Sequence, residues 1–193
     1  MLWDALATTD SYATVQGHQA DVNDVAWSPD GNRIATASWD RSIWILDAKT
    51  ASPVTTLQGH SGGVYALSWS PDSIHLATVS EDTTLKIWNT LSGYNVVTLG
   101  ETQFTEPTSN TSYWTWTPDD NHIYSENKHS ASIVSVDWSP TGKHVATGSS
   151  DHTIRIWNTA TWKTTAILKG HSGTIYSVDW SPDEKFIASA GED

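Results

Sequence analysis

A phrase of sequence recurs along this chain at a nearly constant spacing. A His stands nine residues before a Trp, the Trp is followed by Ser-Pro, and an Asp closes the phrase at a fixed distance after the Trp. The four clear copies centre on Trp27, Trp69, Trp138 and Trp180. The step from Trp27 to Trp69 equals the step from Trp138 to Trp180. A fixed period of roughly 40–45 residues predicts a repeat architecture, in which each unit buries its apolar face by stacking on its neighbours.

Each copy has the pattern of short strands joined by turns. In the second copy, residues 64–69 alternate apolar with small or polar residues, as a strand with one packed face does. Ser70-Pro71-Asp72 is a turn sequence, because Pro presets φ and the Asp side chain bonds to nearby backbone. Further strands are expected at 76–79, 84–88 and 94–99. No stretch has a sustained helical period, so we expect almost no helix.

Four short antiparallel strands per unit, arranged radially, make a β-propeller. Three copies open with Gly-His, and Trp-Asn ends the third expected strand at Trp88-Asn89 and Trp157-Asn158. These signatures resemble the WD-repeat (WD40) family of propellers over nearly the whole chain. The resemblance implies an all-β propeller of four to five blades of antiparallel strands, with a truncated third repeat and an incomplete terminal blade.

The repeat boundaries predict a single domain over residues 1–193. Repeats are expected at 17–58, 59–99, 100–127 (degenerate), 128–169 and 170–193 (incomplete). In the degenerate copy the step from Trp69 to Trp116 is longer than the regular one, and the step from Trp116 to Trp138 is far shorter, so a third strand and the outer strand of the next blade are missing. Residues 122–125 fit a second strand of this copy. Residues 132–138 fit either the inner strand of the next blade or a third strand of the degenerate copy, and the pattern leaves both open.

The two ends of the chain raise a related question. Asp193 stands just before the place of a third strand, and Leu2-Trp3-Asp4 resembles the end of such a strand. Residues 1–16 are therefore candidates to close the last blade. Three alternatives follow for the whole: a segment of a longer repeat protein, self-association that caps open blade edges, or a strained ring of four to five blades closing alone.

The resemblance implies a buried polar network in each blade, made of a His, a strand hydroxyl, the turn Asp and a Trp. Such a network pins the turn when every group has a partner, and half of one leaves costly unpaired groups. Leu46 stands where the first copy should have its Trp, so a looser first blade is expected. The network positions are His18, Thr36 and Asp40; His60, Thr78, Asp82 and Trp88; His129, Thr147, Asp151 and Trp157; and His171, Ser189 and Asp193.

No catalytic constellation is evident. The chain has no Cys, no Gly-x-Ser-x-Gly and no phosphate-binding Gly loop. Four of the eight His residues fall at the network position, and none has a metal-binding spacing such as His-Glu-x-x-His. We therefore expect no enzyme activity, no catalytic residue, no metal and no cofactor.

The composition of the chain limits which classes of partner and which cellular compartment are expected. The formal charge is −12, from 22 acidic against 10 basic residues, so no basic stripe for nucleic acid is expected. No apolar run approaches the roughly 18 residues of a membrane span. The lack of Cys and of a recognisable signal peptide makes the cytoplasm the expected compartment, with the nucleus left open.

The resemblance places partner binding on the loops and strand ends at one face of the ring. Three aromatics there, Trp39, Tyr65 and Tyr176, are typical of interface anchors, although ordinary packing between blades explains them as well. Acidic neighbours favour a basic protein or peptide. The full set of binding positions is Asp21, Asn23, Trp39, Tyr65, Glu81, Val134, Ser150 and Tyr176, with Gly63, Ser132, Thr174 and Glu192 at equivalent places.

The function predicted from these observations is a non-catalytic scaffold for protein–protein interaction. Two rivals stand beside it. One is a structural segment of a longer repeat protein with no partner of its own. The other is an enzyme that uses the central face of the propeller, which a cluster of ionisable side chains in the central channel would favour.

Overall fold

The computed structural model describes residues 2–3, 11–100, 122–123 and 128–193, and all regular structure within them is β. Three sheets have four consecutive antiparallel strands each, which we call the first, second and third blades. The first blade is β3 (Val22–Trp27), β4 (Arg33–Ser38), β5 (Ser42–Asp47) and β6 (Pro53–Gln58). The second is β7 (Val64–Trp69), β8 (His75–Ser80), β9 (Leu85–Asn89) and β10 (Asn95–Leu99). The third is β12 (Ile133–Trp138), β13 (His144–Ser149), β14 (Thr153–Asn158) and β15 (Thr164–Lys169).

A fourth unit consists of two strands only, β16 (Ile175–Trp180) and β17 (Ile187–Gly191), and we call it the half-blade. It has the same Trp-Ser-Pro turn as the complete blades. The expected all-β fold, an incomplete propeller, is confirmed.

The Ser-Pro-Asp turn between the first two strands of the first blade, the second blade and the half-blade is closed by its own side chains. In the second blade the N–H of Ser70 donates to His75 O at 2.9 Å, and the carboxylate of Asp72 accepts from the N–H groups of Ile74 and His75 at 2.7 and 3.0 Å. Ser73 adopts a positive φ of 60°, which the short turn requires. The recurring tripeptide therefore sets the strand register of the blade.

The blades pack face to face through their first strands. Side chains of β7 enter the space beside the first blade, where Ile43, Leu57, Leu67 and Trp88 are buried together. Burying a Leu-sized side chain contributes about 1.5–3 kcal/mol. A second cluster, which includes Leu85, Leu99 and Ile133, joins the second and third blades, so the core is a row of such clusters.

The degenerate copy does not separate the second and third blades, since β12 contacts both β7 and β8. Within the third blade β12 is the inner strand, which decides between the two placements of residues 132–138. Residues 122–123 form β11 (His122–Ile123), which pairs in parallel with β10 at the outer edge of the second blade. This differs from the expected second strand of copy three, whose other residues lie largely outside the described ones.

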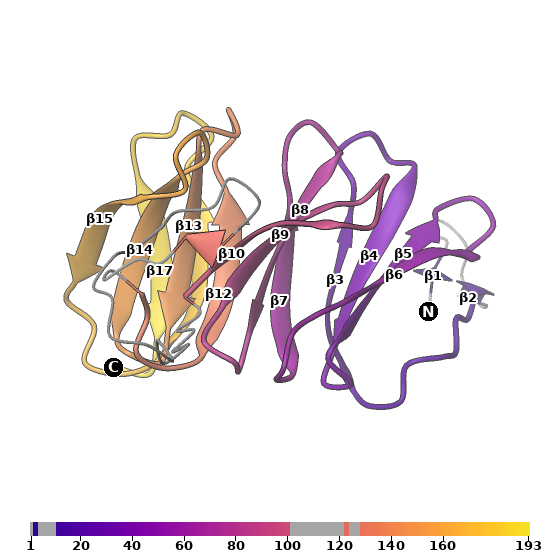
Figure 1. Cartoon of the computed structure of the whole chain (residues 1–193), viewed down its shortest axis with the longest axis horizontal. Coiled ribbons are helices and arrows are strands. Elements are labelled where there is room, and N and C mark those ends of the chain that lie inside the picture. The colour runs from indigo at the N-terminus through magenta and orange to yellow at the C-terminus, as the bar shows by residue number, and fades with distance from the viewer. Residues whose placement is uncertain (1, 4–10, 101–121, 124–127) are drawn as a thin grey trace, which may run out of the picture.

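The blades form an open row, with the two chain ends at opposite ends of it (Figure 1). At the N-terminal end β1 (Leu2–Trp3) pairs with β2 (Ser11–Ala13), and at the other end the half-blade is a two-stranded sheet. The N-terminal strands therefore do not complete the last blade of their own chain, which was the expected closure. The described residues form an open arc of blades and not a closed ring.

Nothing in the described segments is a helix long and apolar enough to cross a membrane.

Candidate functional site

A chain of hydrogen bonds runs through the second blade from an indole to a carboxylate. The indole N–H of Trp88 donates to Thr78 Oγ1 at 2.8 Å, and Thr78 Oγ1 lies 2.8 Å from His60 Nε2. His60 Nδ1 lies 2.9 Å from Asp82 Oδ2. These contacts assign the tautomer: the Thr78 hydroxyl donates to Nε2, and Nδ1–H donates to the carboxylate.

The carboxylate of Asp82 also closes the loop on either side of it. Its Oδ1 accepts from the N–H and the hydroxyl of Thr84 at 3.0 and 2.7 Å, and its Oδ2 accepts from the N–H of Ser61 at 2.8 Å. With these bonds both carboxylate oxygens are occupied. The arrangement therefore holds two loops together, which is a structural task.

The third blade repeats the same network. The distances are 2.9 Å from Trp157 Nε1 to Thr147, 2.8 Å from Thr147 to His129, and 2.9 Å from His129 to Asp151. The four residues come from β13, β14 and the two loops, at the spacing found in the second blade. The indole is buried in both blades, so its N–H has a partner where water does not reach.

Burial and hydrogen bonding shift the pKa values of the His and the Asp in each network. Burial lowers the pKa of His60 and of His129 below the ordinary 6.5, against the raising influence of the neighbouring Asp. Burial alone would raise the pKa of Asp82 and Asp151, but hydrogen bonds from the His and the Thr outweigh it and hold both well below the ordinary 3.8. Each network therefore contains a neutral imidazole and an ionised carboxylate near neutral pH.

The first blade departs from this pattern where the sequence does. His18 lies 2.8 Å from both Thr36 and Asp40, as in the other blades. Leu46 takes the Trp register position, and among the described contacts no indole bonds to Thr36. The ring of Trp44, two residues earlier, lies against His18 with centroids 4.9 Å apart.

The half-blade has the first three members of the network. His171 Nε2 lies 2.8 Å from Ser189 Oγ, and its Nδ1 contacts the carboxylate of Asp193. All three side chains are more exposed than their counterparts in the complete blades.

The predicted binding positions meet at one end of the blades, and we call this set the loop rim. In every unit the residue before the turn Asp donates its N–H to the carbonyl of the residue six positions before the motif Trp. The pairs are Trp39 to Asp21 at 2.9 Å, and Glu81 to Gly63, Ser150 to Ser132 and Glu192 to Thr174 at 3.0 Å each.

Trp39 and Tyr65 form an aromatic pair across the boundary of the first and second blades. Their ring centroids are 5.0 Å apart with planes at 76°, an edge-to-face arrangement. Trp39 covers Gly63 so closely that a Cβ there would come within 2.2 Å of its ring. Trp39 nevertheless keeps 39% of its surface exposed and Tyr65 is half-buried, so the pair both packs between blades and faces solvent.

The other rim positions have mixed roles. Asn23 donates its side-chain amide to Val64 O at 2.8 Å and so bridges two blades. Asp21, Glu81 and Glu192 are exposed, while Val134 and Ser150 are half-buried. Tyr176, 56% exposed, lies on β16, the first strand of the half-blade. Burial first, and then the charge of Glu81, raise the pKa of the Tyr65 hydroxyl, which therefore stays protonated at neutral pH.

The sequence reasoning missed carboxylates that join neighbouring blades. Asp24 Oδ2 accepts from the N–H of Leu67 at 2.9 Å, and Asp137 Oδ2 accepts from the N–H of Trp180 at 2.9 Å. The separation along the chain is the same in both cases. An Asp on the first strand of these copies was the available signal.

In the described parts of the chain, no group of three or more His, Cys, Asp or Glu side chains is placed to hold a metal ion.

Comparison with known protein families identifies the family to which this repeat architecture belongs. The profile described as WD domain, G-beta repeat matches residues 9–47, 51–89, 120–158 and 162–193, well over half of the chain. The chain belongs to the WD40 family. Proteins of this family are typically interaction scaffolds and are generally not enzymes.

Individual relatives match over one repeat or little more. Ribosome assembly protein 4 of Saccharomyces cerevisiae is 48% identical over 48 residues, which is 25% of this chain and 9% of the relative. A guanine nucleotide-binding protein subunit beta of Solanum tuberosum is 43% identical over 49 residues, 25% of this chain and 13% of the relative. Protein HIRA of Dictyostelium discoideum is 54% identical over 33 residues, 17% of this chain and 3% of the relative. The chain thus matches only a small part of each relative's length.

Proposed function

We propose that this WD40 chain is a non-catalytic scaffold that captures a basic peptide segment of a partner protein on the loop rim. The observation that carries the proposal is the Trp39–Tyr65 pair, partly exposed at a blade boundary. Large, rigid aromatic rings lose little entropy on binding and are enriched among the residues that dominate interface energies.

The charge around the pair favours a basic partner. Glu81 is exposed on the second blade, next to the first blade that carries Trp39. Asp21 is also exposed, and its backbone carbonyl accepts a hydrogen bond from the Trp39 N–H. An Arg side chain can place its guanidinium over the Trp39 ring while it pairs with a rim carboxylate. The net charge of −12 also steers a basic segment toward the protein.

The same charge argues against nucleic acid as the partner. Phosphate backbones bind through clustered Lys and Arg, whose contacts release counterions. The rim residues named above include three acids and no base. One relative is named as a ribosome assembly protein and another as a subunit of a guanine nucleotide-binding protein, and both names agree with a scaffold role.

The test is fluorescence anisotropy with three labelled ten-residue peptides, which alternate Gly with Arg, Glu or Ser. We expect the Arg peptide to bind tightest and its affinity to fall with salt. Trp39→Ala and Tyr65→Ala should weaken it by about tenfold or more while the chain stays folded. Tyr94→Ala is the matched control, because Tyr94 is 76% exposed in the turn between β9 and β10, away from the rim positions.

Equal binding of the three peptides, or equal losses in Tyr94→Ala and Trp39→Ala, contradicts the proposal. Circular dichroism melts of each variant separate lost binding from lost folding.

A further inference from the structure

The guanidinium of Arg155 is buried in the third blade without a hydrogen-bond partner. Arg155 lies on β14 and is 9% exposed, and its Nε and Nη1 atoms have no partner among the described residues. Burial lowers its pKa, but a guanidinium remains charged at neutral pH. A buried charge without a partner is costly, so it marks a place where an anion would be stabilised.

The second blade shows the same position with an acceptor beside the cation. There Lys86 takes the place of Arg155, and its Nζ donates to Thr98 Oγ1 at 2.9 Å across the β9–β10 pair. In the third blade Ile167 takes the place of Thr98, directly opposite Arg155. An Ile side chain cannot accept a hydrogen bond. The third blade therefore keeps the cation of this position but not its acceptor.

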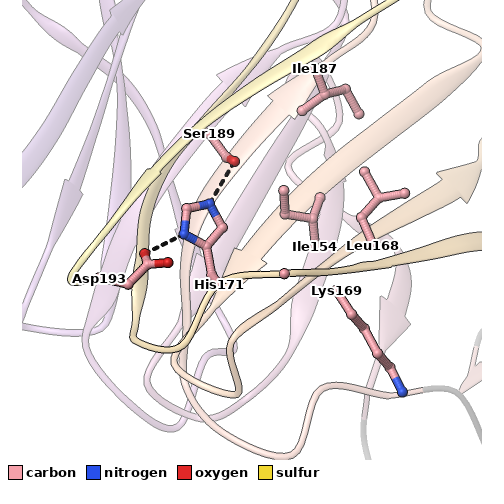
Figure 2. Close-up of a pocket in the computed structure, with 8 residues that line it drawn as sticks. Ile154, Leu168, Lys169, His171, Ile187, Ser189 and Asp193 are labelled. Carbon is pink, nitrogen blue, oxygen red and sulfur yellow. Dashed lines mark hydrogen bonds and ion pairs between the residues drawn. The ribbon is translucent and has the colours of Figure 1, made fainter.

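Lys169 lies on the same face of the third blade as Arg155. Successive strand residues face opposite sides, and Lys169 is two residues from Ile167, the register partner of Arg155. On the opposite face, Ile154 and Leu168 line a cavity of about 410 Å³ beside the half-blade. Figure 2 shows the Lys169 side chain extending away from both. Arg155 and Lys169 are thus diagonal neighbours on adjacent strands, at a spacing of about 7–8 Å.

The face that carries these two cations is directed toward the second blade. Trp157, two residues from Arg155 on β14, packs with Leu85 and Leu99 of the second blade. Ile167 is nevertheless 37% exposed. Solvent therefore reaches this face beside the guanidinium, and a small ion can approach there.

A third cation stands where the first blade has a glycine. Lys128 directly precedes His129, at the place that Gly17 has in the first blade. The ring of Trp44, which takes the register place of Arg155, lies against Gly17. The equivalent places in the third blade are therefore neighbours, and we expect Lys128 and Arg155 to line one site.

No described carboxylate is free to neutralise these cations. Within the described residues, neither Lys128, Lys169 nor Arg155 forms an ion pair. The charge of Asp151 acts on Arg155 from beyond ion-pair distance. Its two oxygens already accept hydrogen bonds from His129 and from the loop residues on either side.

We propose that Arg155, Lys169 and Lys128 form a binding site for a small oxyanion of the phosphate type at the boundary of the second and third blades. A guanidinium binds phosphate through paired N–H bonds, and ammonium groups add point charges. The site suits one compact anion and not a nucleic-acid chain, because the cations gather at one buried group and the whole chain carries a charge of −12. It is separate from the loop rim and does not rest on the function proposed there.

The test is a calorimetric titration with inorganic phosphate in chloride buffer at constant ionic strength. We expect saturable binding at one site per chain. Arg155→Met should raise the dissociation constant about tenfold or more, because it removes the paired donors. Lys169→Met and Lys128→Gly should raise it less. Lys143→Met, at an exposed Lys in the β12–β13 turn, is the matched control and should bind as the wild type does.

Two variants connect binding to the unpaired charge. Ile167→Thr gives Arg155 the kind of acceptor that Lys86 has, so it should weaken phosphate binding. Without phosphate, Arg155→Met should melt at or above the wild-type temperature, because an apolar side chain replaces an unpaired buried charge. The melting curve therefore also shows that lost binding is not lost folding.

A second probe, O-phosphoserine, identifies the source of the anion. Equal binding of O-phosphoserine and inorganic phosphate indicates a phosphate carried on another molecule, and binding of inorganic phosphate alone indicates the free ion. The absence of saturable binding for both probes would overturn the site. So would equal binding by Arg155→Met and the wild type, or an Arg155→Met chain that melts well below the wild type. Trp39→Ala should bind phosphate normally, so this proposal and the loop-rim proposal fail separately.

Discussion

The carboxylate of Asp137 on the third blade accepts a hydrogen bond from the backbone N–H of Trp180 on the half-blade, across 2.9 Å. Asp24 makes the same kind of bond to Leu67 between the first and second blades. Apolar contacts alone allow neighbouring sheets to slide, whereas a bond from a side chain to one backbone N–H fixes their offset. These carboxylates therefore position the second blade against the first and the half-blade against the third.

Replacing Asp137 should cost more stability than replacing an exposed carboxylate. Asp137→Ala leaves the Trp180 N–H without its acceptor, which costs about 1–3 kcal/mol in the free energy of unfolding. Asp137→Asn keeps an oxygen at the site and should lose less. Urea unfolding measures both, with Asp21→Ala as the control at an exposed Asp. Equal losses at positions 21 and 137 would show that the bond contributes nothing.

Stability should fall in two stages as the solution becomes acidic. The pKa of His60 and of His129 is lowered by burial, so below the ordinary 6.5 the unfolded chain takes up protons that the folded chain does not. The carboxyls of Asp82 and Asp151 have lowered pKa values too, which adds a second loss below about pH 4 as the unfolded chain is protonated first. Melting temperatures measured from pH 8 to pH 3 should decline in both windows.

A substitution at one buried His separates the contribution of the imidazoles to the pH dependence of stability from that of the carboxyls. His129→Gln removes one of the two buried imidazoles, so its melting temperature should be lower at pH 7 but should change less between pH 7 and pH 5. The exposed His152 provides the control, and His152→Gln should keep the wild-type slope. A wild-type melting temperature that does not change between pH 7 and pH 5 would contradict the neutral, buried state of His60 and His129.

The indole N–H should contribute separately from the indole ring. Trp157→Phe keeps an aromatic ring in the buried site but removes the donor to Thr147 Oγ1. We expect a loss of about 1–2 kcal/mol, from the bond and from the smaller ring. Trp39→Phe, at a ring that is partly exposed, should lose less free energy of unfolding. Guanidinium titrations of both variants measure the two losses. If the two losses are alike, the bond to Thr147 is not a stabilising element.

The network residues could be predicted from sequence because their geometry is local to one blade. His60, Thr78, Asp82 and Trp88 keep fixed places on strands and turns that follow a Trp-Ser-Pro turn at a constant distance. The same spacing returns in the third blade with nearly identical distances. A repeated spacing carries this information even without knowledge of how blades stack.

The relations between blades could not be predicted in that way. The direct packing of β12 on β7 joins segments that are far apart in sequence, and the alternating pattern of residues 132–138 suits an inner strand in any blade. The contact of Trp44 with His18 was missed because Trp44 lies two residues from the expected Trp position. The pairing of β11 with β10 rests on two residue pairs, too few to leave a pattern in sequence.

The Trp39–Gly63 contact yields a prediction in which two substitutions offset each other. Gly63→Ala places a methyl group within 2.2 Å of the Trp39 ring, so the ring must leave its site against Tyr65. We expect a loss of about 1–3 kcal/mol in the free energy of unfolding, as in other overpacked sites, and a shift in Trp fluorescence. In a Trp39→Ala background the clash is absent, so Gly63→Ala should cost almost nothing there. A double-mutant cycle from urea titrations measures this coupling, and strictly additive losses would show that the ring does not rest on Gly63 in solution.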